Sequence, residues 1–357
     1  MRGTRSTIWA IVCTFLLFAG EVTASIFAWR TDIFLAATQL AGFVLGCVIA
    51  PIVHELGHIV MAKSQDMQIV YAKFSFFKMS ERKGKLRFGF ASPFAADETQ
   101  VIPKSGGNMQ KRARLYTIGG LLFGGIYFII VGMAALTLGI MVGGYVFYGV
   151  LGLLPFAAYL FLLNVLPMEY NSGKTDALIY KGLKTSAPAE QTMLAAMEIQ
   201  GELFAGKSYA EIEERLYFDV PQLSEDEPLF AVMLDLRYRY WLDKKEMEKA
   251  ADCLNRLAQA EVYLTDTETQ RIAAEFVYMH ALNRDRERAE ACAKGCTEYL
   301  QQDTLTAKRI LAAVAYLGDN MEAVASLKEQ ANAIMQTEKI SGNRKFEKSL
   351  LDRLPEA

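Results

Sequence analysis

The chain has almost no net charge, few cysteines and only three histidines, and each shortage excludes something. With 38 Lys and Arg against 40 Asp and Glu, the formal charge is −2, so the charge balance does not favour binding to nucleic acid. Five cysteines, an odd number without the spacing of a disulfide framework, favour reduced thiols. Apolar residues are abundant instead: they make up 52% of the 357 residues, and they concentrate between residues 8 and 166.

Two of the three histidines lie within five residues, in the sequence His-Glu-Leu-Gly-His of residues 54–58. On a helix, His54 and His58 would stand on one face, one turn apart. Two neutral imidazoles at that spacing can share a zinc ion, and Glu55 beside them can act as general base on zinc-bound water. The flanking residues are apolar, and ionisable groups inside a bilayer are costly enough to indicate a function. We therefore predict a zinc site on a membrane helix.

Four apolar stretches are long enough to cross a hydrocarbon core of about 30 Å, and we expect each to be a helix. They cover residues 7–28, 33–62, 115–142 and 144–166. The second is longer than a perpendicular span requires, and Pro51 is the expected position of a break. The first could be a cleaved signal peptide, because its start is basic and residues 22–24 resemble a cleavage site. Its continuing apolar character favours a retained helix.

Charge predicts the orientation of these helices. Residues 63–114 contain eleven Lys and Arg against four Asp and Glu, which places this loop in the cytoplasm. Both chain termini then also lie in the cytoplasm, and the links near residues 30–32 and 142–144 face outward. We expect a multi-pass membrane protein, and the compact architecture with short outer loops favours a bacterial cell membrane.

A third metal ligand is needed, because a catalytic zinc usually has three protein ligands and one open position. His280 lies in the C-terminal half, and Cys47 is seven residues from His54, about 10 Å along a helix. A carboxylate after the fourth apolar stretch remains, since the second and fourth stretches run the same way and end at similar depth. Asp176 is favoured, and Glu169 is the alternative.

The combination resembles the site-2 protease family of intramembrane zinc metalloproteases. That family pairs a membrane-embedded HExxH helix with a later Asn-x-x-Pro…Asp-Gly segment whose aspartate completes the zinc site. The matching residues are His54, Glu55 and His58 for the first motif, and Asn164, Pro167 and Asp176 for the second. Ala177 replaces the common glycine, and the stretch between Pro167 and Asp176 is longer than usual.

The resemblance covers about residues 30–185 and implies an activity. A family member hydrolyses a peptide bond in or next to a transmembrane segment of a substrate protein. Asn164, with Pro167 beside it in the motif, would bind substrate backbone near the zinc. The rival function is a non-catalytic membrane scaffold with a structural zinc site. Glu55 argues against that rival, because a structural site needs no base.

Two features lie around the third apolar stretch. Residues 69–76 and 85–90 alternate as strands do, with turn-like residues 80–84 between them. We therefore expect a small membrane-associated β-hairpin in about residues 66–104, to whose edge an extended substrate could add. The glycines at 119, 120, 124 and 125 are interpreted as allowing close helix packing.

The C-terminal half is charged and rich in helix formers. We expect a mainly α protein, with a membrane domain in residues 1–184 and an all-α repeat domain in residues 185–357. Similar segments around Ala250, Ala289 and Ala323, 39 and 34 residues apart, indicate stacked helical hairpins similar to degenerate tetratricopeptide repeats. Such arrays often bind a protein partner, here in the cytoplasm; a compact cap on the membrane domain is the alternative.

Overall fold

The computed structural model describes residues 3–82, 85–92, 97–170, 173–225, 227–260 and 264–355. The prediction of a mainly α protein with four long apolar helices, a small β-region and a helical C-terminal half is confirmed. The chain forms two compact units. Unit 1 comprises residues 1–102 and 108–190, and unit 2 comprises residues 103–107 and 191–357.

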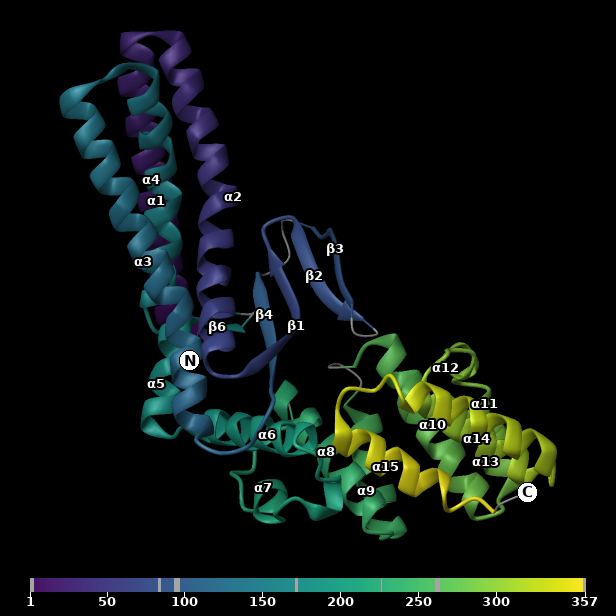
Figure 1. Cartoon of the computed structure of the whole chain (residues 1–357). Helices are drawn as coiled ribbons and strands as arrows, with labels where there is room; N and C mark the ends of the chain where they lie inside the picture. The colour runs from purple at the N-terminus through teal and green to yellow at the C-terminus, as the bar shows by residue number, and fades with distance from the viewer. Residues whose placement is uncertain are drawn as a thin grey trace. The chain divides into compact units, whose positions relative to one another are not determined.

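Unit 1 is built on four long helices that run alongside one another (Figure 1). They are α1 (Gly3–Thr31), α2 (Ile33–Ser64), α3 (Met109–Met141) and α4 (Gly144–Val165). All four are long and apolar enough to cross a membrane. Helix α2 packs against the other three. The predicted spans agree with these bounds to within a few residues, except that α3 begins six residues earlier.

The predicted break at Pro51 is wrong, because α2 continues through this residue as one helix. Helix α2 packs closely against α4 in the turns before this proline. A Cβ on Gly42 would collide with the carbonyl of Gly149, and a Cβ on Gly152 would collide with the carbonyl of Gln39. The backbones of α2 and α4 therefore touch before Pro51, and this contact supports α2 along its length.

The sheet of unit 1 is larger than the predicted hairpin. Strands β1 (Met67–Phe74), β2 (Phe77–Arg82), β3 (Lys85–Phe90) and β4 (Glu98–Pro103) form one sheet in the order β3-β2-β1-β4. The predicted pairing of residues 69–76 with residues 85–90 is wrong, because β2 lies between them and pairs antiparallel with both.

The chain reverses direction near Ser75, which has a left-handed backbone with φ of 55°. Serine favours turns only weakly, and no glycine, proline or asparagine accompanies it, so the sequence indicates this reversal only weakly. The turn predicted at residues 80–84 includes Lys83 and Gly84, which lie outside the described residues.

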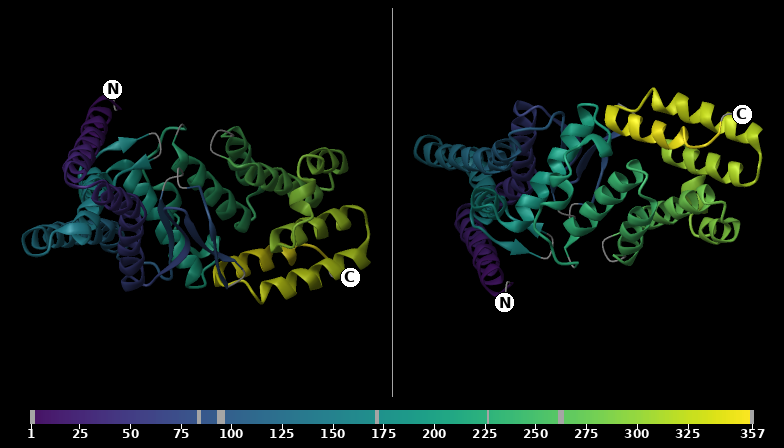
Figure 2. Two further views of the ribbon diagram at one scale, coloured as in Figure 1. Left: turned by 90° about the horizontal axis from the view of Figure 1, so that it is seen from above. Right: turned by 90° about the horizontal axis from the view of Figure 1, so that it is seen from below.

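The regular elements of unit 2 within described residues 191–355 are helices. Its elements are α6 (Pro188–Phe204, which begins at the end of unit 1), η1 (Tyr209–Glu211), α7 (Arg215–Phe218), α8 (Pro228–Asp243), α9 (Met247–Gln259), α10 (Asp266–Leu282), α11 (Arg286–Ala293), α12 (Thr297–Leu300), α13 (Leu305–Leu317), α14 (Met321–Met335) and α15 (Ser341–Leu351). Figure 2 shows the green and yellow helices of this unit as antiparallel neighbours. Helices α8 and α9, α10 and α11, and α13 and α14 form packed pairs.

The three helical pairs share one turn geometry. Each has a single left-handed residue between its helices: Lys245, Arg284 and Asp319. Five residues further on lies a buried residue in each second helix, and these residues are Ala250, Ala289 and Val324. In the third pair the equivalent position is therefore Val324, one residue after Ala323, which the sequence comparison had matched. Since period and turn recur together, the unit is built from related helical hairpins.

Candidate metal centre

Three side chains from two helices converge in unit 1. His54 and His58 lie one turn apart on α2, and Asp176 is the first residue of α5 (Asp176–Thr185). Both histidines are buried: the exposed fraction is 7% for His54 and 6% for His58. Oδ2 of Asp176 lies 3.2 Å from Nε2 of each histidine. The three residues form a group that could hold a metal ion.

A short hairpin brings Asp176 back to the histidines. Strands β5 (Glu169–Tyr170) and β6 (Gly173–Lys174) pair antiparallel directly after α4. Thr175 closes the loop: its Oγ1 donates to the Leu166 carbonyl at 2.7 Å and accepts from the Met168 amide at 3.0 Å. The extra residues between Pro167 and Asp176 are thus taken up by the hairpin. The length of this stretch does not keep Asp176 from the site.

The other predicted site residues lie elsewhere. Glu169, the alternative ligand, is exposed on β5 and is not part of the convergent group. Asn164 is partly buried near the end of α4, and its amide donates to the Leu160 carbonyl of its own helix at 3.1 Å. Pro167 is exposed after α4. The structure therefore brings Asp176, rather than Glu169, to the histidines.

The hydrogen bonding of His58 shows what the group lacks. Its Nδ1 lies 3.1 Å from the Tyr116 carbonyl, which can only accept, so Nδ1 carries the proton. In the neutral ring, the Nε2 lone pair then points toward Asp176. Oδ2 of Asp176 has no hydrogen-bond partner within the described chain although it is buried. Acceptor atoms that face one another in this way repel unless a proton or a metal cation lies between them.

The charge of Asp176 fits such a cation. An aspartate carboxyl is ordinarily an anion at neutral pH. An anionic oxygen and two imidazole nitrogens form a ligand set suited to a divalent metal.

Space for the ion is kept open by a glycine on α3. A Cβ on Gly120 would lie 2.7 Å from Nε2 of His54 and closer still to Nε2 of His58. Gly57 and Gly119 bring the backbones of α2 and α3 into direct contact beside it. The packing interpretation thus suits Gly119, whereas Gly120 leaves room in front of the ligand atoms. Any side chain at position 120 would occupy that room.

Glu55 lies beside the group and is held from outside its own helix. Glu55 is only 4% exposed. Its Oε2 accepts a hydrogen bond of 2.6 Å from Oγ1 of Thr99 on β4. The hydroxyl of Tyr116 on α3 donates in turn to the Thr99 carbonyl. Glu55 is therefore a buried carboxylate with one defined hydrogen-bond donor, next to a candidate metal position.

Sequence reasoning missed four contributors: Thr99, Tyr116, Gly120 and Thr175. The Gly119-Gly120 pair was a signal for close approach, but it did not show which glycine faces the imidazoles. Thr99 and Tyr116 carried no signal, because their roles depend on contacts with residues far away in sequence.

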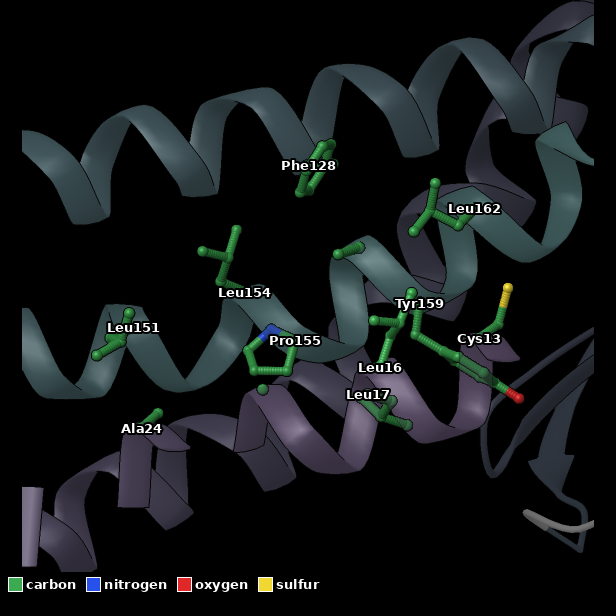
Figure 3. Close-up of a pocket in the computed structure, with 12 residues that line it drawn as sticks. Cys13, Leu16, Leu17, Ala24, Phe128, Leu151, Leu154, Pro155, Tyr159 and Leu162 are labelled. Carbon is green, nitrogen blue, oxygen red and sulfur yellow. The ribbon is translucent and has the colours of Figure 1, made fainter. Parts of the chain in front are cut away.

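The apolar cavity drawn in Figure 3 is a separate feature. It has a volume of about 290 Å³ and lies among α1, α3 and α4, with Phe128, Leu154 and Pro155 in its wall. Its lining includes none of the three convergent residues. A large apolar pocket is the usual first candidate for a binding site. Here the ligand chemistry at His54 is the stronger indication, because the cavity offers almost no polar group.

Comparison of the chain with protein-family models, curated proteins and solved structures gives no match.

Proposed function

We propose that the protein is an intramembrane zinc metalloprotease that hydrolyses a peptide bond in or next to a transmembrane segment of a substrate protein. The observation that carries this proposal is the convergence of Asp176 with His54 and His58 beside Glu55, where both histidines and Glu55 lie on a helix apolar enough to cross a membrane. A structural metal site would need the three ligands but not a buried carboxylate next to them.

Zinc is compatible with the two ligand separations that involve Asp176. Ligand atoms about 2.0–2.1 Å from a tetrahedral zinc ion lie about 3.3 Å from one another. The separation from Asp176 Oδ2 to each Nε2 is 3.2 Å. Three protein ligands also leave one tetrahedral position for water or substrate, as catalytic sites require.

The residues of the chain divide the chemistry between them. When bound, the metal would lower the pKa of a coordinated water and polarise the scissile carbonyl. Glu55 would accept the proton of the attacking water and then deliver it to the leaving amine. Oε2 of Glu55 accepts a hydrogen bond from Thr99, so Oε1 would be the atom that exchanges the proton. Tyr116 fixes the tautomer of His58 through its carbonyl.

The resemblance to site-2 proteases supports the substrate class. Asn164 and Pro167 would bind substrate backbone beside the metal, as the matching motif does in that family. The orientation inferred from charge would place the site near the cytoplasmic side of a bacterial cell membrane, with both termini in the cytoplasm. Residues 185–357 would bind a cytoplasmic protein partner.

Glu55→Gln tests the proposal most directly. The chain in detergent would be analysed for zinc by elemental analysis and assayed for cleavage of a panel of transmembrane peptides. We expect near-stoichiometric zinc in wild type and variant, with cleavage at least about 100-fold slower in the variant, because a positioned general base contributes that much.

Glu21→Gln is the matched control, since Glu21 is the other acidic residue within the four long helices. Its carboxylate accepts from Gln39 at 2.9 Å and is not part of the convergent group. This variant should cleave at the wild-type rate. Zinc in every variant with no cleavage by wild type would favour the scaffold function. No zinc in wild type would refute the site itself.

A further inference from the structure

The helix that carries Glu55 does not aim this carboxylate by itself. Successive residues of an α-helix point about 100° apart, so Glu55 leaves α2 in a different direction from His54. A glutamate side chain also has several rotatable bonds, and its free rotation would spread the carboxylate over many positions. A base that is fixed in position therefore needs an outside partner.

Strand β4 supplies that partner through Thr99. The Thr99 side chain donates to Glu55 at 2.6 Å, and both residues are buried. Hydrogen bonds to a charged acceptor are stronger than neutral ones, and burial strengthens them further. Thr99 is thus placed to hold the carboxylate in one rotamer.

A chain of contacts also ties Thr99 to the metal ligands. The Tyr116 hydroxyl donates to the Thr99 carbonyl, and the Tyr116 carbonyl accepts from His58 Nδ1. Base and ligand are therefore linked through one residue of α3 and one of β4. A shift of β4 by a fraction of an ångström would move the base relative to the ligands.

The start of β4 is itself anchored to β1. Asp97, the residue before β4, pairs with Lys73 at 2.7 Å and accepts from the Ser75 amide at 2.8 Å. Lys73 is only 2% exposed, whereas the Asp97 side chain is 28% exposed, so the pair is partly buried. The sheet thus fixes the position at which Thr99 meets Glu55.

We infer that β4, through Thr99, is a positioning element that sets the catalytic competence of Glu55 without contributing to metal binding. This inference rests on the proposed proteolytic function. It also implies a form of regulation: a ligand or substrate that displaces β4 would disable the base while the metal stays bound. Thr99 is a positioning residue and does not touch the reacting atoms.

Thr99→Val tests the inference, because valine keeps the shape of threonine and removes only the donor. With a cleaved transmembrane peptide in detergent, we expect kcat to fall about 10- to 100-fold, with KM and zinc content within about two-fold of wild type. Thr99→Ser should restore most of kcat, since it keeps the hydroxyl. Thr117→Val is the matched control, because the buried Thr117 hydroxyl donates only within α3, to the Ala113 carbonyl.

A second measurement does not depend on activity. Infrared difference spectra of Thr99→Val against wild type should show a shifted carboxylate band, because Glu55 loses its donor. The same comparison in a Glu55→Gln background should lack that band. If wild type cleaves the peptide and kcat is unchanged in Thr99→Val, the inference is overturned. Loss of zinc in Thr99→Val, or a kcat in Thr99→Ser that stays as low as in Thr99→Val, would also overturn it. If wild type itself does not cleave, the proposed function fails, while the infrared band still tests the contact.

Tyr116→Phe separates the two links in this chain of contacts. It removes the hydroxyl that reaches Thr99 but keeps the backbone carbonyl that binds His58. We expect kcat to fall about 2- to 10-fold, as for loss of one neutral hydrogen bond, with zinc content unchanged. A loss of zinc here would show that Tyr116 supports the metal rather than the strand, and would contradict the inference.

Discussion

Unit 1 and unit 2 each bury a cluster of charged or ionisable side chains, and the two clusters are satisfied differently. In unit 2, Arg309 is fully buried and pairs at 2.7 Å with both Glu275 and Glu347. Hydroxyls of Tyr238 and Thr306 donate to the same carboxylates at 2.8 and 3.0 Å. Both buried carboxylates of this cluster therefore have donors within the protein, although Nη1 of Arg309 has no hydrogen-bond partner among the described residues.

The cluster of unit 1 is not matched in this way. The Asp176 oxygen closest to the two Nε2 atoms has no hydrogen-bond donor within the described chain. A metal ion could be the missing partner, and Gly120 leaves space in front of the ligand atoms. Buried polar groups that satisfy one another stabilise a fold, whereas an unmatched carboxylate oxygen between two imidazole nitrogens is typical of a metal-binding group.

The largest expected effect is in the matched cluster. Arg309→Leu should destabilise unit 2 by about 3–5 kcal/mol, because it leaves two buried carboxylates without their cation. Urea unfolding of the full chain in detergent, followed by hydrogen exchange at α13, would measure this loss. Zinc content should stay at the wild-type level, since the two clusters do not share residues.

A control for that prediction replaces the whole cluster. Arg309→Leu combined with Glu275→Leu and Glu347→Leu should recover much of the stability, because an apolar set of similar volume needs no charge balance. A single Arg309→Leu variant as stable as wild type would show that the two clusters do not differ as described.

An intermediate effect is expected at the unmatched cluster. Asp176→Ala should weaken zinc binding by about 100-fold or more, about 2.7 kcal/mol. Loss of a residue that only hydrogen-bonds to a metal ligand already lowers metal affinity about 10- to 100-fold, and Asp176 would be a ligand itself. Competition with a chelator would measure the affinity. Glu169→Ala is the matched control and should bind zinc as wild type does. The opposite result would make Glu169 the ligand.

The smallest of the three effects concerns space rather than charge. Gly120→Ala should weaken zinc binding about ten-fold, or 1.4 kcal/mol, because the new methyl group crowds both Nε2 atoms. The matched control is Gly124→Ala, whose Cβ would meet His54 Nδ1 at 3.5 Å, an ordinary contact. Equal chelator resistance in these two variants would mean that Gly120 does not shape the site.

Some elements were predictable because local physics decides them. A long apolar run in a bilayer must satisfy its own backbone hydrogen bonds, so the four helices follow from composition. The helical hairpins of residues 228–335 follow from 3.6-residue periodicity and a repeat. The sheet was predicted less well, because Ser75 is a weak turn signal and strand pairing depends on residues far apart.

By itself, the sequence determined the four apolar helices, the placement of His54 and His58 on one helical face, and Glu55 beside them, because each depends on spacing along one segment. Only the tertiary structure decided that Asp176 completes the group, that Gly120 leaves space beside it and that Thr99 donates a hydrogen bond to Glu55. These contacts join segments 44 or more residues apart. Such contacts form only when the packing of helices and strands brings distant residues together, and no local pattern records that packing.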